Sequence, residues 1–334
     1  MQIALGVTSG WTSFNNRPHH LPQLAEKSGF NTLWIGEDID KPRDIFTLTS
    51  IVLLQTRTIR VGIGITSPLI RNVSTIARAA VTLAEMGDTE RFVLGLGVGG
   101  LQDLGKLGIE VRQPTAMLRD VVNLLRSIWK GEAVTFESNY FQLERYSPRF
   151  AADYDIPIFF GVRGPKLLEL AGEIADGAII SGPKRYLAKA VELVKKGIEK
   201  RGKQGRAFQI VVWMPTILTE KKTDVALAKQ AVAIVLADTA PSVVEMAELD
   251  AAKVEGIKQA FQRGGLDKAA SMVTDELLQE TAIHGNAEQL CHKFEGVEKK
   301  LGADEVVFGP PYGVNRQEAM MRFAETWKRR RRRI

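Results

Sequence analysis

Short apolar segments alternate with amphipathic helical segments along nearly the whole chain, and this alternation limits the possible folds more than any other feature. The apolar segments are too short for helices, and their composition suits buried strands. They cover residues 2–7, 31–35, 59–65, 91–100, 156–160, 178–180, 208–218 and 305–308. Eight strands, each followed by a helix, predict an α/β fold of the (β/α)8 TIM-barrel type. A doubly wound open sheet would not need eight regular units.

Two segments interrupt this repeat. Residues 132–154 alternate polar and aromatic side chains, which indicates an inserted hairpin. Residues 238–273 form a polar insertion with helical character. Because no linker divides the remaining units, we expect one barrel domain over residues 1–327, followed by a basic tail at 328–334.

The tail accounts for the basic character of the protein. The net charge is +6, and Lys328 to Arg333 contribute six positive charges, so the body is near neutral. Such a run predicts a solvated, disordered end, and nucleic acid binding only as a weak affinity of the arginine tail for RNA or an acidic partner. A barrel without catalysis that binds partners through this tail is the non-enzymatic alternative.

No apolar run approaches the roughly 20 residues of a membrane span, and the N-terminus lacks a signal-peptide pattern. Cys291 is the only cysteine, which excludes an intramolecular disulfide and a cysteine metal cluster. A free thiol suits a reducing compartment. We therefore expect a cytoplasmic protein with no membrane partner.

Small residues dominate the C-terminal ends of the expected strands, where the active site of a TIM barrel lies. In the fourth strand every second residue from Gly95 to Gly99 is glycine. These glycines either let a ligand approach the main chain closely or make room for neighbouring strands. Such a rim suits a large cofactor and offers few groups for acid-base catalysis.

Two loops at this rim have the pattern of anion sites. Gly161 to Gly164, with Arg163 between them, precedes Pro165 at a helix start, and Ser181-Gly182-Pro183-Lys184 repeats the pattern one unit later. Backbone N–H groups at a helix start attract anions, so the loops predict a phosphate-bearing ligand. The alternative is a structural Gly-Pro turn.

Glu37 and Asp38 adjoin at the end of the second strand and are the candidate catalytic residues, as general acid or base. The alternative is a structural role, as a loop cap or as an ion-pair partner of Arg43 or Arg71. The four histidines lack metal-ligand spacing with a third donor, so we expect no metal site.

Three stretches resemble the luciferase-like flavin and deazaflavin superfamily, and within it the coenzyme F420-dependent methylenetetrahydromethanopterin reductases. They are residues 61–68, 107–120 and 156–178. The resemblance implies a TIM barrel, a deazaflavin across the rim, and hydride transfer between its C5 atom and the bridging methylene carbon of a pterin. It also implies a small-molecule substrate and a homo-oligomer. An FMN-dependent luciferase-like monooxygenase is the alternative.

The resemblance further implies roles for individual residues. Gly64-Ile65 matches a non-proline cis peptide behind the deazaflavin ring, and Gly97 to Gly99 match backbone that lines the ring. The loops at 161–164 and 181–182 match the region of the ribityl chain and phosphate. The expected cofactor-binding residues are Gly64, Ile65, Thr66, Ser67, Gly97, Val98, Gly99, Gly161, Val162, Arg163, Gly164, Ser181, Gly182 and Lys184.

Departures from the family pattern fall where the substrate should bind. Gly6 and Gly100 stand where the reductases carry acidic residues, and Glu37-Asp38 stands where they carry an aspartate-histidine pair. The cofactor positions therefore match better than the pterin positions. The substrate stays open among a modified pterin, an alcohol and something smaller.

Overall fold

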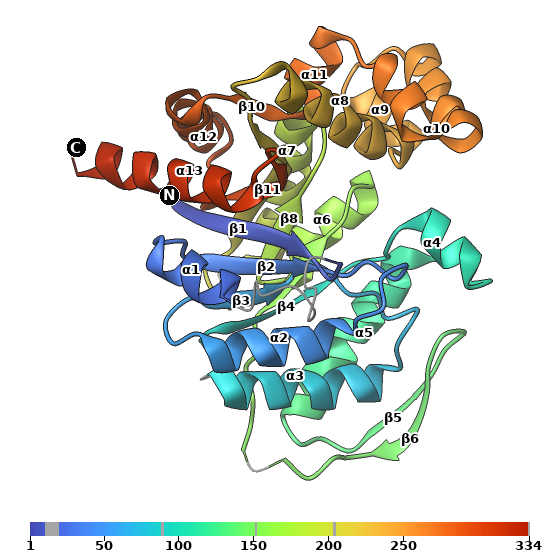
Figure 1. The fold of residues 1–334 in the computed structure, drawn as a ribbon. Coiled ribbons are helices and arrows are strands. Elements are labelled where there is room, and N and C mark those ends of the chain that lie inside the picture. Colours follow the sequence, from blue (N-terminus) through green and yellow to red (C-terminus); the bar gives the residue numbers. More distant parts are fainter. Residues whose placement is uncertain (11–19, 88–89, 151, 203–204, 333–334) are drawn as a thin grey trace.

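The computed structural model of the chain describes residues 1–10, 20–87, 90–150, 152–202 and 205–332. Eight parallel strands close into a barrel through a final pairing of β8 with β9 (Figure 1). In spatial order they are β1 (Gln2–Thr8), β2 (Thr32–Gly36), β3 (Arg60–Ile63), β4 (Phe92–Leu96), β7 (Ile158–Gly161), β8 (Gly177–Ile180), β9 (Gln209–Leu218) and β11 (Glu305–Tyr312). The predicted TIM barrel is confirmed.

Helices surround this barrel, and the signals that predict their starts are present. The Asp44 side chain accepts a hydrogen bond from the Thr47 N–H at 2.9 Å, and Asn286 and Gln289 form both halves of a capping box. The helices are α1 (Leu21–Lys27), α2 (Ile45–Gln55), α3 (Val73–Gly87), α4 (Leu101–Lys106), α5 (Pro114–Trp129), α6 (Pro165–Ile174), α7 (Lys184–Arg201), α8 (Lys222–Ala237), α9 (Pro241–Met246), α10 (Ala251–Ser271), α11 (Asp275–Thr281), α12 (Ala287–Leu301) and α13 (Arg316–Arg331). None of these is long and apolar enough to cross a membrane, within the described residues.

Both expected insertions stand out from the barrel (Figure 1). β5 (Val134–Glu137) and β6 (Gln142–Tyr146) form an antiparallel hairpin. At another side of the barrel, α8, α10 and α11 pack around their own apolar core. A further short strand, β10 (Ile283–Gly285), pairs with the end of β9 and was not expected from the sequence.

The N-terminal end of the barrel interior is closed by a buried ion pair. Glu305 is 1% exposed and lies 3.2 Å from Arg60. Its carboxylate also accepts hydrogen bonds from Thr32 Oγ1 at 2.6 Å and from Trp34 Nε1 at 2.5 Å. These partners compensate the buried charge. The interior at the end of the barrel away from the expected site is therefore filled by a stable polar cluster.

The prediction of a disordered tail is wrong for residues 328–331, which continue α13. Arg330 lies 2.8 Å from Glu295 and 3.2 Å from Glu288, both on α12. The sequence shows the positive run but not the acidic helix face beside it. Positions 333 and 334 lie outside the described residues.

Candidate functional site

Two adjoining cavities open at the C-terminal ends of the strands. One, the glycine cavity, is about 540 Å³ in volume and is bordered by Gly99, Gly100 and Gly164. The other, the tryptophan cavity, is about 610 Å³ in volume and is bordered by Trp213 and by α8. Both volumes are in the range of small-molecule sites. Gly64, Ile65, Gly161, Val162 and Arg163 border both cavities.

The peptide bond between Gly64 and Ile65 is cis, as expected. It follows the end of β3, and both of its residues contribute to the surface that the two cavities share. Any molecule that extends from one cavity into the other therefore passes over this peptide.

The glycines of the fourth strand divide into two groups. A Cβ on Gly95 would lie 1.9 Å from the Ile63 carbonyl oxygen, and one on Gly97 would lie 2.5 Å from that of Gly161. Those two glycines make room for neighbouring strands, as the packing alternative proposed. Gly99, with a positive φ of 95°, borders the glycine cavity together with Val98. Close ligand approach is thus available only at the end of the glycine run.

The first predicted anion loop borders both cavities. Gly164 is the N-cap of α6 and has no side-chain capping bond, so this helix start is open to a ligand. Arg163 extends from the loop and lies 3.5 Å from Asp238, at the end of α8. Burial raises the pKa of Asp238, while the positive charge of Arg163 acts in the opposite direction.

The second predicted anion loop is less open. Ser181 borders the tryptophan cavity, but Gly182 packs against the Tyr186 ring. Lys184 borders neither cavity, and its Nζ donates to the Gln279 carbonyl oxygen. Burial and then the positive charge of Lys293 lower the pKa of Lys184. The structure therefore does not bring Lys184 together with the other predicted cofactor residues.

Thr66 and Ser67 lie beside the shared surface rather than on it. Thr66 Oγ1 donates to Glu37 at 2.7 Å, and Ser67 Oγ donates to the Val98 carbonyl oxygen at 2.6 Å. Both side chains are buried. Their contacts connect the loop after β3 to the ends of β2 and β4.

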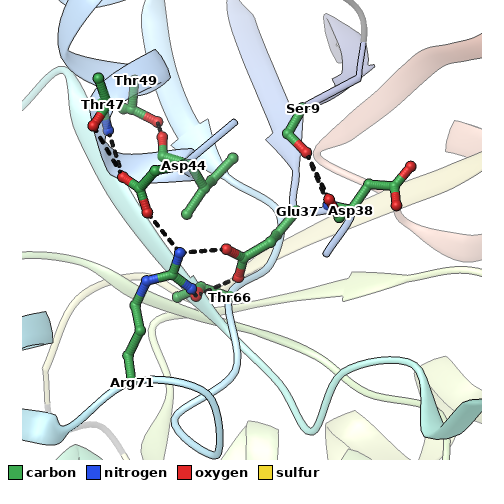
Figure 2. A network of polar contacts seen from close by, with 9 residues as sticks. Ser9, Glu37, Asp38, Asp44, Thr47, Thr49, Thr66 and Arg71 are labelled. Carbon is green, nitrogen blue, oxygen red and sulfur yellow. Dashed lines mark hydrogen bonds and ion pairs between the residues drawn. The ribbon is translucent and has the colours of Figure 1, made fainter. Parts of the chain in front are cut away.

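Glu37 belongs to an ion network (Figure 2). Arg71 lies 2.6 Å from Glu37 and 2.7 Å from Asp44, which matches the structural alternative for Glu37. Burial alone would lower the pKa of Arg71, but its hydrogen bonds to both carboxylates outweigh burial and raise it. The Glu37 side chain is 7% exposed, so its carboxylate is held rather than free to move.

Asp38 is placed differently from its neighbour. Figure 2 shows its carboxylate pointing away from that of Glu37. The backbone N–H of Asp38 donates to Ser9 Oγ at 3.0 Å. Asp38 also borders the tryptophan cavity. Within the described part of the chain, Asp38 forms no ion pair. The two candidate carboxylates therefore do not act as a pair: Asp38 borders the tryptophan cavity without an ion-pair partner, whereas Glu37 borders the glycine cavity and is held there by Arg71 and Thr66.

The sequence did not single out Trp213, which faces the tryptophan cavity from β9. The residues that follow it alternate in the same way: Met214 and Thr216 are completely buried, whereas Pro215 borders the tryptophan cavity. Alternate strand residues point to opposite faces, so Trp213 and Pro215 face the cavity while Met214 and Thr216 face the core. Leu227 and Gln230 of α8 and Leu266 of α10 also border this cavity. Their helical spacing did not indicate that they would border the cavity.

Comparison with known proteins agrees with this geometry. The profile of the family described as luciferase-like monooxygenase matches residues 19–305. A 5,10-methylenetetrahydromethanopterin reductase from Archaeoglobus fulgidus is 31% identical over 306 residues, covering 89% of this chain and 90% of the relative. An F420-dependent glucose-6-phosphate dehydrogenase from Nakamurella multipartita is 32% identical over 198 residues, covering 55% of this chain and 58% of the relative.

Solved structures share the fold across the full length. The coenzyme F420-dependent tetrahydromethanopterin reductase of Methanopyrus kandleri superposes with a TM-score of 0.86, at 22% identity and 99% coverage of both chains. An F420-dependent secondary alcohol dehydrogenase superposes with a TM-score of 0.76, at 20% identity and 97% coverage of both chains. With the matched family profile spanning most of its length, the chain belongs to the luciferase-like monooxygenase family.

Proposed function

We propose that this enzyme transfers a hydride between the C5 atom of coenzyme F420 and a carbon of a reduced pterin, as a methylenetetrahydromethanopterin reductase or a close relative with an altered substrate. The chain is an F420-dependent oxidoreductase by its relatives, which include methylenetetrahydromethanopterin reductases about 30% identical over nine tenths of the chain. The observation that carries the proposal is the pair of cavities that share Gly64 and Ile65. Hydride transfer requires two molecules in contact, and adjoining cavities give both a place.

The described residues fit a deazaflavin. Two of the five residues of the shared surface, Gly64 and Gly161, are glycines. A Cβ on Gly161 would come within 2.5 Å of Ile65 Cγ2, so this part of the surface needs glycine. The open start of α6 and the guanidinium of Arg163 would hold a phosphate. Bound F420 supplies the hydride chemistry, and the protein supplies binding and orientation.

Side chains outside the surface shared by the two cavities have separate roles in this proposal. Asp38 would orient the substrate from the end of β2, since this residue borders the tryptophan cavity. The Glu37, Arg71 and Asp44 network would keep the β2 and β3 loops in place. Apolar residues of α8, among them Leu227 and Ile234, would limit water at the reacting carbon.

Titration of the purified protein with F420, FMN and NADPH tests the cofactor, with binding followed by the fluorescence of F420 or FMN. We expect binding of F420 and F420-dependent turnover of methylenetetrahydromethanopterin. Arg163→Gln should weaken F420 binding about tenfold, because it removes a charge-assisted contact to phosphate. Arg206→Gln is the matched control, since Arg206 pairs with Asp155 on the surface. Tight FMN binding without F420 binding would overturn the proposal.

A homo-oligomeric state, a cytoplasmic location and a single domain over residues 1–327 stay predictions.

A further inference from the structure

One large side chain, Trp213, fills the centre of the barrel just below the cavities, and three glycines lie beside it, two of them in strands and one directly after β3. A Cβ on Gly6 of β1 would lie 2.4 Å from Trp213 Cζ2, and one on Gly309 of β11 would lie 2.4 Å from its Nε1. A Cβ on Gly64, directly after β3, would lie 3.1 Å from its Cζ3. The indole therefore takes the space of these side chains, and an acidic residue at position 6 could not be accommodated beside it.

This indole is the floor of the tryptophan cavity. Ile179 and Pro215 adjoin it from the barrel, and Leu227, Ile234 and Leu266 face the cavity from α8 and α10. Asp38 and Arg163 are the charged residues among the described part of its lining. Most of the surface offered to a ligand is consequently apolar.

The indole N–H of Trp213 is one of the few uncharged polar groups of this cavity, beside the side chains of Thr8, Ser181 and Gln230. Trp34, the other large indole inside the barrel, donates its N–H to Glu305. Trp213 Nε1 has no hydrogen-bond partner among the described residues. This atom is also not completely buried. Indole N–H groups inside a protein normally donate to a hydrogen-bond acceptor. Because the described part of the chain supplies none here, the N–H of Trp213 is available to an acceptor atom of a ligand.

We propose that Trp213 determines substrate specificity, in that it selects a substrate whose buried end is uncharged, largely apolar and carries one hydrogen-bond acceptor. This inference rests on the function proposed above, and it names the chemistry of the group that reaches the barrel floor. An anionic group there would lose its hydration against a largely apolar lining with few neutral polar side chains, which disfavours its binding. The inference concerns binding alone.

Calorimetric titration of the F420-saturated protein tests the proposal with two ligands that share one ring, cyclohexanone and 4-oxocyclohexanecarboxylate. We expect the neutral ketone to bind at least about tenfold more tightly than the carboxylate. Trp213→Phe keeps the apolar floor but removes the donor, so the affinity for cyclohexanone should fall about fivefold. Trp327→Phe is the matched control, because Trp327 packs on Phe323 in α13. It should change neither affinity.

A second pair of variants tests the apolar wall on one helix. Leu227→Ala removes a side chain that borders the cavity, and Val225→Ala removes an exposed side chain of α8 outside it. The first should weaken cyclohexanone binding, and the second should not. Equal affinities of the two ketones for the intact protein, or an unchanged cyclohexanone affinity in folded Trp213→Phe, would overturn the role of Trp213. Failure of the intact protein to bind F420 would instead refute the proposed function.

Discussion

At the scale of single residues, Glu37 and Asp38 are neighbours with different surroundings, and their substitution should separate structure from catalysis. Glu37→Gln removes the ion pair with Arg71, which still keeps Asp44 at 2.7 Å. We expect a loss of about 1–3 kcal/mol in the free energy of unfolding, because a charge-assisted contact of a buried carboxylate is lost. The turnover number should stay within about threefold of the unchanged enzyme. Urea unfolding and steady-state kinetics measure the two effects.

Asp38→Asn is the matched comparison for this prediction. It removes the charge of a residue that borders the tryptophan cavity, so kcat/KM should fall about tenfold or more while stability changes little. A fall of 100-fold or more in the turnover number of Glu37→Gln, of the order produced by loss of a general acid or base, would show that Glu37 is catalytic after all.

A site residue could be predicted from the sequence where its role depends on residues next to it in the chain, and not where it depends on distant residues. The sequence indicated the shared surface at Gly64 and Ile65 and the loop at Arg163, because local motifs carry those features. It left open whether Glu37 pairs with Arg71, since such a contact depends on how two loops meet. Trp213 gave no local signal, because its importance comes from three glycines that are distant from it in sequence.

At the scale of elements, Glu26 connects α1 to the turn between α2 and β3. Its Oε1 accepts hydrogen bonds from the backbone N–H groups of Arg57 at 2.9 Å, Thr58 at 2.6 Å and Ile59 at 3.0 Å. Burial alone would raise the pKa of Glu26, but these bonds together outweigh burial and lower it to about 2. The turn thus depends on an ionised carboxylate.

Glu26→Gln should destabilise the protein at neutral pH by about 1 kcal/mol, a figure reduced for the partial exposure of the side chain. The folded pKa of about 2 lies below the ordinary value of 4.5. The carboxylate therefore stabilises the fold fully above about pH 4.5, and this contribution is lost as the pH falls through about 2. Thermal unfolding of both proteins from pH 7 to pH 3 measures the difference, which should shrink below pH 4.5. A constant difference over that range would contradict the prediction.

The repeat of strands and helices could be predicted because each unit buries its own apolar face. The short strand β10 could not, since its three residues, with His284 in the middle, have no strand pattern of their own. They pair only because the long strand β9 extends beyond its neighbour β8. The same holds for the arginine tail, whose helical conformation depends on acidic residues of α12.

At the scale of the whole molecule, the two ends of the chain meet at the face of the barrel opposite the cavities. The N-terminal amino group of Met1 lies 3.0 Å from Glu298, and Arg331 lies 3.5 Å from the same residue. Lys328 Nζ donates to the Lys27 carbonyl oxygen at 2.9 Å. The basic tail therefore joins α13 to α12 and to the end of α1.

Deletion of residues 328–334 should lower the melting temperature by about 2–6 °C, because several partly exposed ion pairs are lost together. Salt should reduce the difference between the intact and shortened proteins, since it screens those pairs. Turnover with F420 should stay unchanged, because the tail lies on the face opposite the cavities. Deletion of 332–334 alone is the control, as it leaves Arg329, Arg330 and Arg331 with their acidic partners. An unchanged melting temperature, or a loss of turnover on the longer deletion, would show that the tail has another role.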